Sequence, residues 1–233
     1  MGRVLFGGGK VGMEPPSAIK PVFADTTWAN IILACQTNTV PDTWAVGDQK
    51  AMIIGGTEYM IDIIGKNHDN YADGSGNAPL TFQLHDSYGT TYSMNSTSTN
   101  AGGWRNSIMR NTNLPIILSV MPLEVSSAIK QVTKQTSCGE QSTTIETTND
   151  GLFLLSEVEV LGTYANSYSG EGRRYQYYDN GGSMIKNVNG SPHSWSTRSP
   201  GRPTLGFAYL NTGGEPKVTY GTSLVGVAPA FCF

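Results

Sequence analysis

Apolar spacing predicts a short helix and a strand early in the chain. Apolar residues three and four positions apart indicate a helix over residues 26–35, which Thr26 or Thr27 can cap at its N-terminus. Leu80–Leu84 alternates apolar and polar residues, so it is expected to form a strand with one buried face. Both elements are short, which favours a fold with many short helices and strands.

Between these two elements the pattern changes to that of a β-hairpin. The run 51–54 is apolar, the run 59–64 alternates around Met60 and Asp62, and Gly55-Gly56-Thr57 lies between them. Glycine pairs are common in tight hairpin turns because glycine adopts positive φ angles at little cost. The sequence therefore predicts two antiparallel strands joined by this turn.

The middle of the chain mixes helical and extended patterns. Residues 104–110 place Trp104 and Ile108 on one helical face, and the apolar stretch 114–120 is ended by Pro122. The segments 128–136 and 143–148 are typical of short strands or extended arms around a polar loop.

A strong local signal follows in the segment 152–162. Leu152–Leu155 is uniformly apolar and predicts a buried strand, and Ser156 and Glu159 then form an S-x-x-E capping box. This box predicts the start of a helix that ends near Gly162.

The last third predicts a long irregular insert followed by closing strands. Residues 164–203 are rich in Tyr, Gly, Asn and Ser and are expected to be dominated by loops. The segments 205–211, 217–220 and 225–233 have strand patterns, and the last of these places Phe231 and Phe233 on one face. Short helices early in the chain, followed by strands that must pair with partners far away in the sequence, indicate an α+β fold.

Composition narrows the function classes. Charged residues make up 14% of the 233 residues and the net charge is −3, so no basic surface is expected for nucleic acid. The chain has no apolar run of 18 residues, so membrane insertion is not expected, and its first residues do not form a secretory signal. We expect folding in a cytoplasm.

The sequence gives little indication of a metal site or of a reactive cysteine. Cys35, Cys138 and Cys232 are odd in number and far apart, so buried free thiols are expected rather than disulfides. The pairs His68-Asp69 and His85-Asp86 could bind a metal if they met in space, but turn-forming or core hydrogen bonds are the simpler interpretation. We therefore expect no metal, no cofactor and no catalytic residues.

The insert contains the main candidate for ligand binding. Its aromatic and arginine side chains lie among small polar residues, a mixture typical of recognition loops. The candidate ligand-binding residues are Tyr175, Tyr177, Tyr178, Trp195, Arg198 and Arg202. The alternative is that several of these rings fill the core beneath a long loop.

The N-terminus is predicted to be an arm. Residues 1–21 contain Gly7-Gly8-Gly9 and Pro15-Pro16, and only Val4, Leu5 and Phe6 form an apolar cluster. This cluster could anchor the chain on another subunit, or the terminus could lie on its own domain, which would comprise residues 22–233.

Six runs of the chain stand out together: TWAVGDQKAMIIGGTEYMIDIIGKNHD (43–69), GGWRNSIMR (102–110), SAIKQVTKQTS (127–137), LFLLSEVEVLG (152–162), SWSTRSPG (194–201) and GVAPAFCF (226–233). They resemble a widespread domain of unknown function that is common in phage and prophage structural proteins of gut Firmicutes. Their order is also similar to the C-type-lectin-like fold, shared by formylglycine-generating enzymes and by receptor-binding proteins of some phages.

The resemblance implies a lectin-like scaffold in which the terminal strand closes the sheet and the insert displays a binding face. It implies a non-catalytic protein of the virion (tail fibre, baseplate or capsid surface), made in the host bacterial cytoplasm. Its expected partners are other virion proteins through the arm, a host cell-surface glycan or protein, and further copies of itself. The calcium-dependent sugar motifs of true C-type lectins are absent, because Glu215-Pro216-Lys217 has the wrong third residue. A purely structural decoration protein and a formylglycine-generating-type enzyme are the alternatives.

Overall fold

The computed structural model describes residues 19–202 and 205–233. The predicted anchor Val4, Leu5 and Phe6 lies outside the described residues. Ile19 packs partly buried against the core, and the backbone carbonyl of Lys20 accepts a hydrogen bond from Trp44 Nε1 at 3.1 Å. The chain is therefore already in contact with its body before the predicted arm ends at residue 21.

The predicted helix and hairpin are confirmed. Helix α1 (Trp28–Gln36) begins after Thr27, whose side chain accepts a hydrogen bond from the Asn30 backbone at 3.3 Å. Strands β1 (Gln49–Ile54) and β2 (Thr57–Lys66) pair antiparallel through the predicted turn.

A four-stranded antiparallel sheet forms one part of the molecule. Its strand order is β1-β2-β3-β11, with β3 at Leu80–Leu84 and β11 at Ala230–Cys232. The last strand of the chain thus pairs with β3, and Cys232 lies beside Thr81 across a separation of 151 residues.

Strand β3 is buried on both faces, so the prediction of a half-buried strand was wrong. On one face Phe82 stacks against Phe23 and Phe231, with ring centroids 6.1 and 5.4 Å apart. On the other face Gln83 donates a hydrogen bond to the Ala228 carbonyl and accepts one from Tyr178 Oη. The polar residues of β3 are therefore paired inside the protein rather than solvated.

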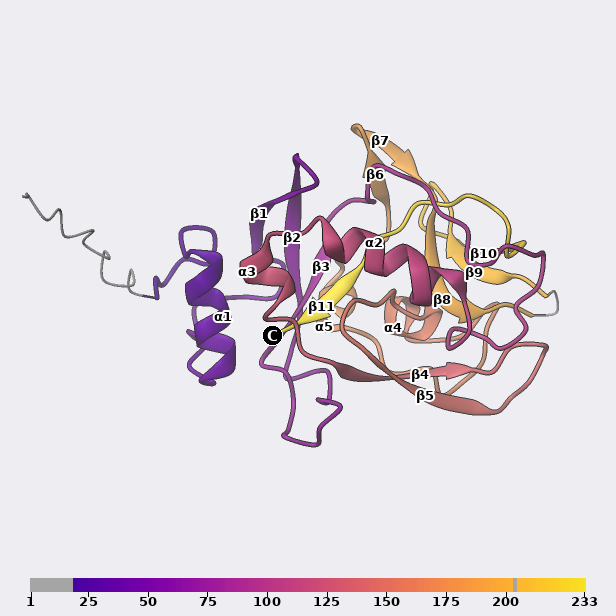
Figure 1. Cartoon of the computed structure of the whole chain (residues 1–233), viewed down its shortest axis with the longest axis horizontal. Coiled ribbons are helices and arrows are strands. Elements are labelled where there is room, and N and C mark those ends of the chain that lie inside the picture. The colour runs from indigo at the N-terminus through magenta and orange to yellow at the C-terminus, as the bar shows by residue number, and fades with distance from the viewer. Residues whose placement is uncertain (1–18, 203–204) are drawn as a thin grey trace, which may run out of the picture.

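Three smaller antiparallel sheets complete the β structure. Their strands are β4 (Val132–Ser137) with β5 (Ile145–Asp150), β6 (Lys186–Val188) with β7 (Ser191–His193), and β10-β9-β8 in that order. The last three are β8 (Trp195–Pro200), β9 (Phe207–Leu210) and β10 (Pro216–Thr219). Figure 1 shows the four-stranded sheet and the β8–β10 sheet toward opposite ends of the molecule, with the β4–β5 hairpin along one side.

The remaining helices are short. They are η1 (Met109–Asn113, a π-helical turn), which runs into α2 (Leu114–Ser119), then α3 (Leu123–Ser126), α4 (Glu157–Leu161) and α5 (Gln176–Asp179). Both hydrogen bonds of the predicted capping box are present at the start of α4, and Gly162 ends the helix with a φ of 76°. Among the helices in the described residues, none has the length and hydropathy that crossing a bilayer requires.

Described residues of the segment 164–203 are mostly irregular, as predicted, but the segment also contains regular elements that the sequence did not predict. This segment contains α5, the β6–β7 hairpin and β8, whose six residues are all buried. The polar composition of β8 suggests an exposed loop, but its Ser, Thr and Arg side chains have hydrogen-bond partners inside the protein, so the strand can be buried.

One hydrophobic core extends from Phe23 to Phe233. Phe231 and Phe233 lie with ring centroids 5.5 Å apart and both contact Phe82, as the alternation at the chain end predicted. The mixture of short helices and small antiparallel sheets confirms the α+β class.

Candidate functional site

The structure places four of the six predicted ligand-binding residues in the interior. Tyr175, Tyr178, Trp195 and Arg198 are each at most 1% exposed. Their polar atoms bond within the protein; Trp195 Nε1, for example, donates to the Met184 carbonyl at 2.9 Å. The prediction of an outward-facing contact surface was wrong for these four residues, because their rings and their guanidinium fill the core.

The other two predicted residues, Tyr177 and Arg202, have different neighbours. Tyr177 is half-buried and packs edge-on against Tyr178, with ring centroids 5.0 Å apart. Arg202 is exposed, and its guanidinium lies 5.7 and 5.3 Å from the ring centroids of Tyr164 and Tyr168. The six residues therefore do not form one exposed surface.

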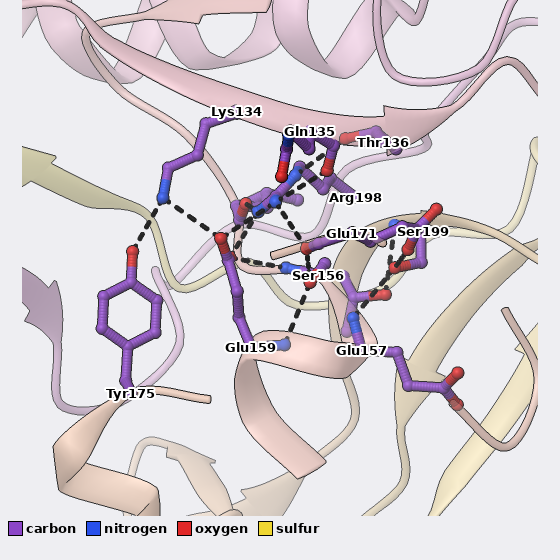
Figure 2. A network of polar contacts seen from close by, with 12 residues as sticks. Lys134, Gln135, Thr136, Ser156, Glu157, Glu159, Glu171, Tyr175, Arg198 and Ser199 are labelled. Carbon is purple, nitrogen blue, oxygen red and sulfur yellow. Dashed lines mark hydrogen bonds and ion pairs between the residues drawn. The ribbon is translucent and has the colours of Figure 1, made fainter. Parts of the chain in front are cut away.

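Arg198 belongs instead to a network of buried charges, and Tyr175 makes hydrogen bonds to that network. Figure 2 shows Glu159 between Lys134 and Arg198. Lys134 Nζ lies 3.2 Å from Glu159 Oε1, and Arg198 holds both carboxylate oxygens of Glu159 at 2.5 and 2.9 Å. Strand β4, helix α4 and strand β8 each supply one of the three side chains.

Asp69 completes this network on the side of Lys134. It accepts hydrogen bonds from Lys134, from Thr81 Oγ1 at 2.5 Å and from Tyr175 Oη at 2.9 Å. Tyr175 Oη in turn lies 2.8 Å from Lys134 Nζ. The four ionised groups of what we call the charge network (Asp69, Lys134, Glu159 and Arg198) therefore sum to zero.

The network keeps its charges despite burial. Burial raises the pKa of Glu159, but Arg198 and Lys134 outweigh this effect and hold that pKa below its usual range. Burial likewise opposes ionisation of Asp69, and Lys134 and Thr81 lower its pKa. The ion pairs and hydrogen bonds thus compensate the desolvation of the charges.

Arg198 is also bonded along its whole guanidinium. Its Nε donates to Thr136 Oγ1 at 2.9 Å, and its terminal nitrogens donate to the carbonyls of Leu154, Gln135 and Glu171. A guanidinium has five N–H donors, and here they join β4, the segment before α4 and the loop that contains Glu171. The side chain therefore ties several segments together.

A second buried carboxylate lies beside the network. Glu171 accepts hydrogen bonds from the Ser137 backbone at 2.9 Å and from Ser199 Oγ. Burial raises its pKa to about 7, and the hydrogen bonds and Arg198 offset only part of this rise. The folded protein therefore holds the proton of Glu171 more tightly than a glutamate in water holds its own.

An open cleft of about 410 Å³ lies over the charge network. Asp69, Lys134 and Glu159 contribute to its floor, and the rim carries amide, hydroxyl and guanidinium groups. The rim residues are Asn70, Thr133, Gln135, Thr147 and Arg173. We call this site the polar cleft. Of its residues, the sequence had drawn attention only to the pair His68-Asp69, as a candidate metal site and not as part of a ligand-binding cleft.

The two His-Asp pairs make hydrogen bonds and ring contacts within the fold. His68 stacks on Tyr175 with ring centroids 3.9 Å apart, and His85 Nδ1 lies 2.9 Å from Asp62 Oδ2. Within residues 19–202 and 205–233, no three His, Cys, Asp or Glu side chains cluster in a way that could hold a metal ion.

The three cysteines are free thiols. Cys35 and Cys232 are buried, and burial raises the pKa of Cys35 to about 12 and that of Cys232 well above its usual range. Burial also raises the pKa of Cys138, which is partly exposed. Since the thiolate is the reactive form, these surroundings disfavour thiol chemistry.

Comparison with known proteins identifies a family without a known activity. A family model described as a domain of unknown function, DUF6273, matches residues 80–233. No curated protein and no solved structure matches the chain. The match covers Lys134, Glu159 and Arg198 as well as the closing strand β11. Because it covers more than half of the chain, the protein belongs to the DUF6273 family.

Proposed function

We propose that this chain is a non-catalytic binding domain displayed on a phage virion, where it binds a host cell-surface glycan or protein through the polar cleft. The observation that carries the proposal is the charge balance of the buried residues at the floor of the cleft. Lys134, Asp69 and Glu159 contribute to it, and their charges are balanced with that of Arg198.

Catalysis needs a group that can exchange a proton or attack a substrate, and its pKa must suit that task. In the polar cleft, Lys134 is bonded to Asp69, Glu159 and Tyr175, and Glu159 is bonded to Arg198. These groups stabilise each other in their ionised forms. Because these side chains are already held in place by their bonds, little conformational entropy of the floor is lost when a ligand binds.

The rim fits a polar ligand. Asn70, Gln135 and Thr147 are exposed, and their side chains supply hydrogen-bond donors and acceptors without a net charge. Arg173 lies across the rim and donates to the carbonyls of Asn67 and His68, which holds it in place. Hydroxyl-rich glycans and polar peptide segments both suit this lining.

The fold proposal is a C-type-lectin-like scaffold. It is supported by the closing strand β11, which pairs with β3 beside the buried end of the chain, and by the small sheets joined by irregular segments. The virion proposal is supported by the resemblance to phage structural proteins and by the low charge, since weakly charged copies repel each other little when packed together. We further propose that residues 1–21 attach the domain to other virion proteins and that it assembles as a homo-oligomer.

Particle fractionation tests the virion assignment. Particles are induced from the strain that encodes the chain, separated on a density gradient and analysed by mass spectrometry. We expect the chain to sediment with the particles, and a chain lacking residues 1–18 to remain in the soluble fraction; this deletion keeps Ile19 and Lys20, which contact the core. A full-length chain found only in the soluble fraction contradicts the assignment.

Cell binding tests the polar cleft. The labelled chain is titrated onto cells of the bacterium that the particles infect, and Gln135→Ala is compared with the wild type. We expect the variant to bind at least tenfold more weakly, because the Gln135 side chain lies at the rim. Gln131→Ala is the matched control, because Gln131 is an exposed glutamine four positions away that does not line the cleft. Equal loss in both variants contradicts the role of the cleft.

A further inference from the structure

A second groove lies between two hairpins, away from the polar cleft. It has a volume of about 370 Å³ and runs between the start of β2, residues 85–89 and the turn of the β6–β7 hairpin. Figure 1 shows the β1–β2 and β6–β7 hairpins projecting on the same side of the molecule. Its lining includes Glu58, Tyr59, Asp86, Asn187 and Asn189, none of which lines the polar cleft. We call it the tyrosine groove.

An aromatic stack fixes one wall of this groove. Tyr59 stacks on Tyr88 with ring centroids 5.4 Å apart and planes at 22°, and Tyr88 stacks on Tyr92 at 6.4 Å and 24°. Tyr59 Oη also accepts a hydrogen bond from the Gly89 backbone at 3.1 Å. Because Tyr88 covers one face of Tyr59, the part of that ring that lines the groove is its other face or its edge.

Paired polar groups also line the groove. Asp86 Oδ1 accepts hydrogen bonds from the Asn187 backbone at 2.7 Å and from Asn187 Nδ2 at 3.0 Å. Among the residues that the structure describes, no hydrogen bond reaches Asp86 Oδ2. A half-buried carboxylate oxygen that lines a groove and is still able to accept is a group that a ligand hydroxyl can satisfy.

We propose that the tyrosine groove is a binding site for a neutral saccharide, in which a pyranose ring packs on Tyr59 and its hydroxyls donate to Asp86. Sugar rings present an apolar C–H face and a rim of hydroxyls, so a fixed aromatic ring beside a carboxylate and two amides matches both features. The carboxylates of Glu58 and Asp86 repel acidic sugars, which selects neutral ones.

Saturation-transfer NMR on the full chain tests this site. The probes are the methyl glycosides of glucose, galactose and mannose together with N-acetylglucosamine, and glucuronic acid is the acidic control. We expect transfer to at least one neutral sugar and none to glucuronic acid. No transfer to any neutral sugar overturns the proposal, and so does stronger binding of the acidic one.

Variants then locate the sugar. Tyr59→Ala should weaken binding of the best probe at least tenfold, and Tyr59→Phe, which keeps the ring, should stay within about threefold of the wild type. Tyr164→Ala is the control, because Tyr164 is an exposed tyrosine outside the groove. An unchanged affinity in Tyr59→Ala refutes the site.

A readout without substitution covers the case in which Tyr59→Ala fails to fold. The ring proton resonances of Tyr59 should shift during titration of the wild type while those of Tyr164 stay in place, and the reverse pattern refutes the groove. This site can fail while the polar cleft stands, because Gln135→Ala tests the cleft alone and should leave sugar binding in the groove unchanged.

Discussion

Replacing Glu159 with glutamine removes the charge that both cations of the network share. Glu159→Gln keeps the shape of the side chain, so packing changes little, but Arg198 loses its carboxylate partner and Lys134 keeps only Asp69. The network, neutral in the wild type, becomes positive by one charge at a site where Arg198 is 0% exposed.

The expected cost follows from this burial. Removing one partner of a buried ion pair typically destabilises a protein by about 3–5 kcal/mol, because the remaining charge is uncompensated. For a chain of this size, about 1 kcal/mol corresponds to a shift of about 2–4 °C in Tm, so the Tm of Glu159→Gln should fall by about 10 °C.

Urea unfolding followed by circular dichroism measures the effect. Glu146→Gln is the matched control, because the Arg105–Glu146 pair is partly exposed and its loss should cost at most about 1 kcal/mol. If Glu159→Gln loses no more free energy of unfolding than Glu146→Gln, the charge network does not hold the core together and the reasoning fails.

Three further predictions concern other groups. The folded-state pKa of Glu171 is raised to about 7, so the folded state binds this proton more tightly than the unfolded state does. The free energy of unfolding should therefore fall by a few kcal/mol as pH rises from about 4.5 to 7. Urea titrations should show this fall in the wild type but not in Glu171→Gln. Gly139→Ala should lower Tm far more than Gly74→Ala, because both glycines have positive φ but only a Cβ at Gly139 meets a backbone oxygen, at 1.9 Å; equal losses contradict this. Iodoacetamide should label only Cys138 in the folded chain and all three thiols in urea, and mass spectrometry that finds a second label under native conditions contradicts the burial of the others.

Elements with local signals were predictable from the sequence. The Thr27 cap, the Gly55-Gly56 turn and the Ser156–Glu159 capping box each involve residues within a few positions of one another, and the structure has all three. Such signals specify where a helix or a turn begins, because the hydrogen bonds that they make are local.

The burial of polar segments was not predictable in the same way. Strand β8 has a polar sequence that is typical of a surface loop, yet it is buried. Its side chains find hydrogen-bond partners such as Thr136, which is 62 residues from Arg198 in the sequence, so no local pattern reveals them. The charge network has the same origin, since Lys134 meets Asp69 across 65 residues and Arg198 meets Glu159 across 39. No pattern along the chain shows which charges will pair across such separations.

The most direct test of the proposed function is the affinity of the chain for cells of the bacterium that the particles infect, measured for the wild type, Gln135→Ala and Gln131→Ala. Saturable binding that weakens at least tenfold in Gln135→Ala and is unchanged in Gln131→Ala is the predicted result. Absence of saturable binding by the wild type, or binding that both variants retain in full, contradicts a binding domain that acts through the polar cleft.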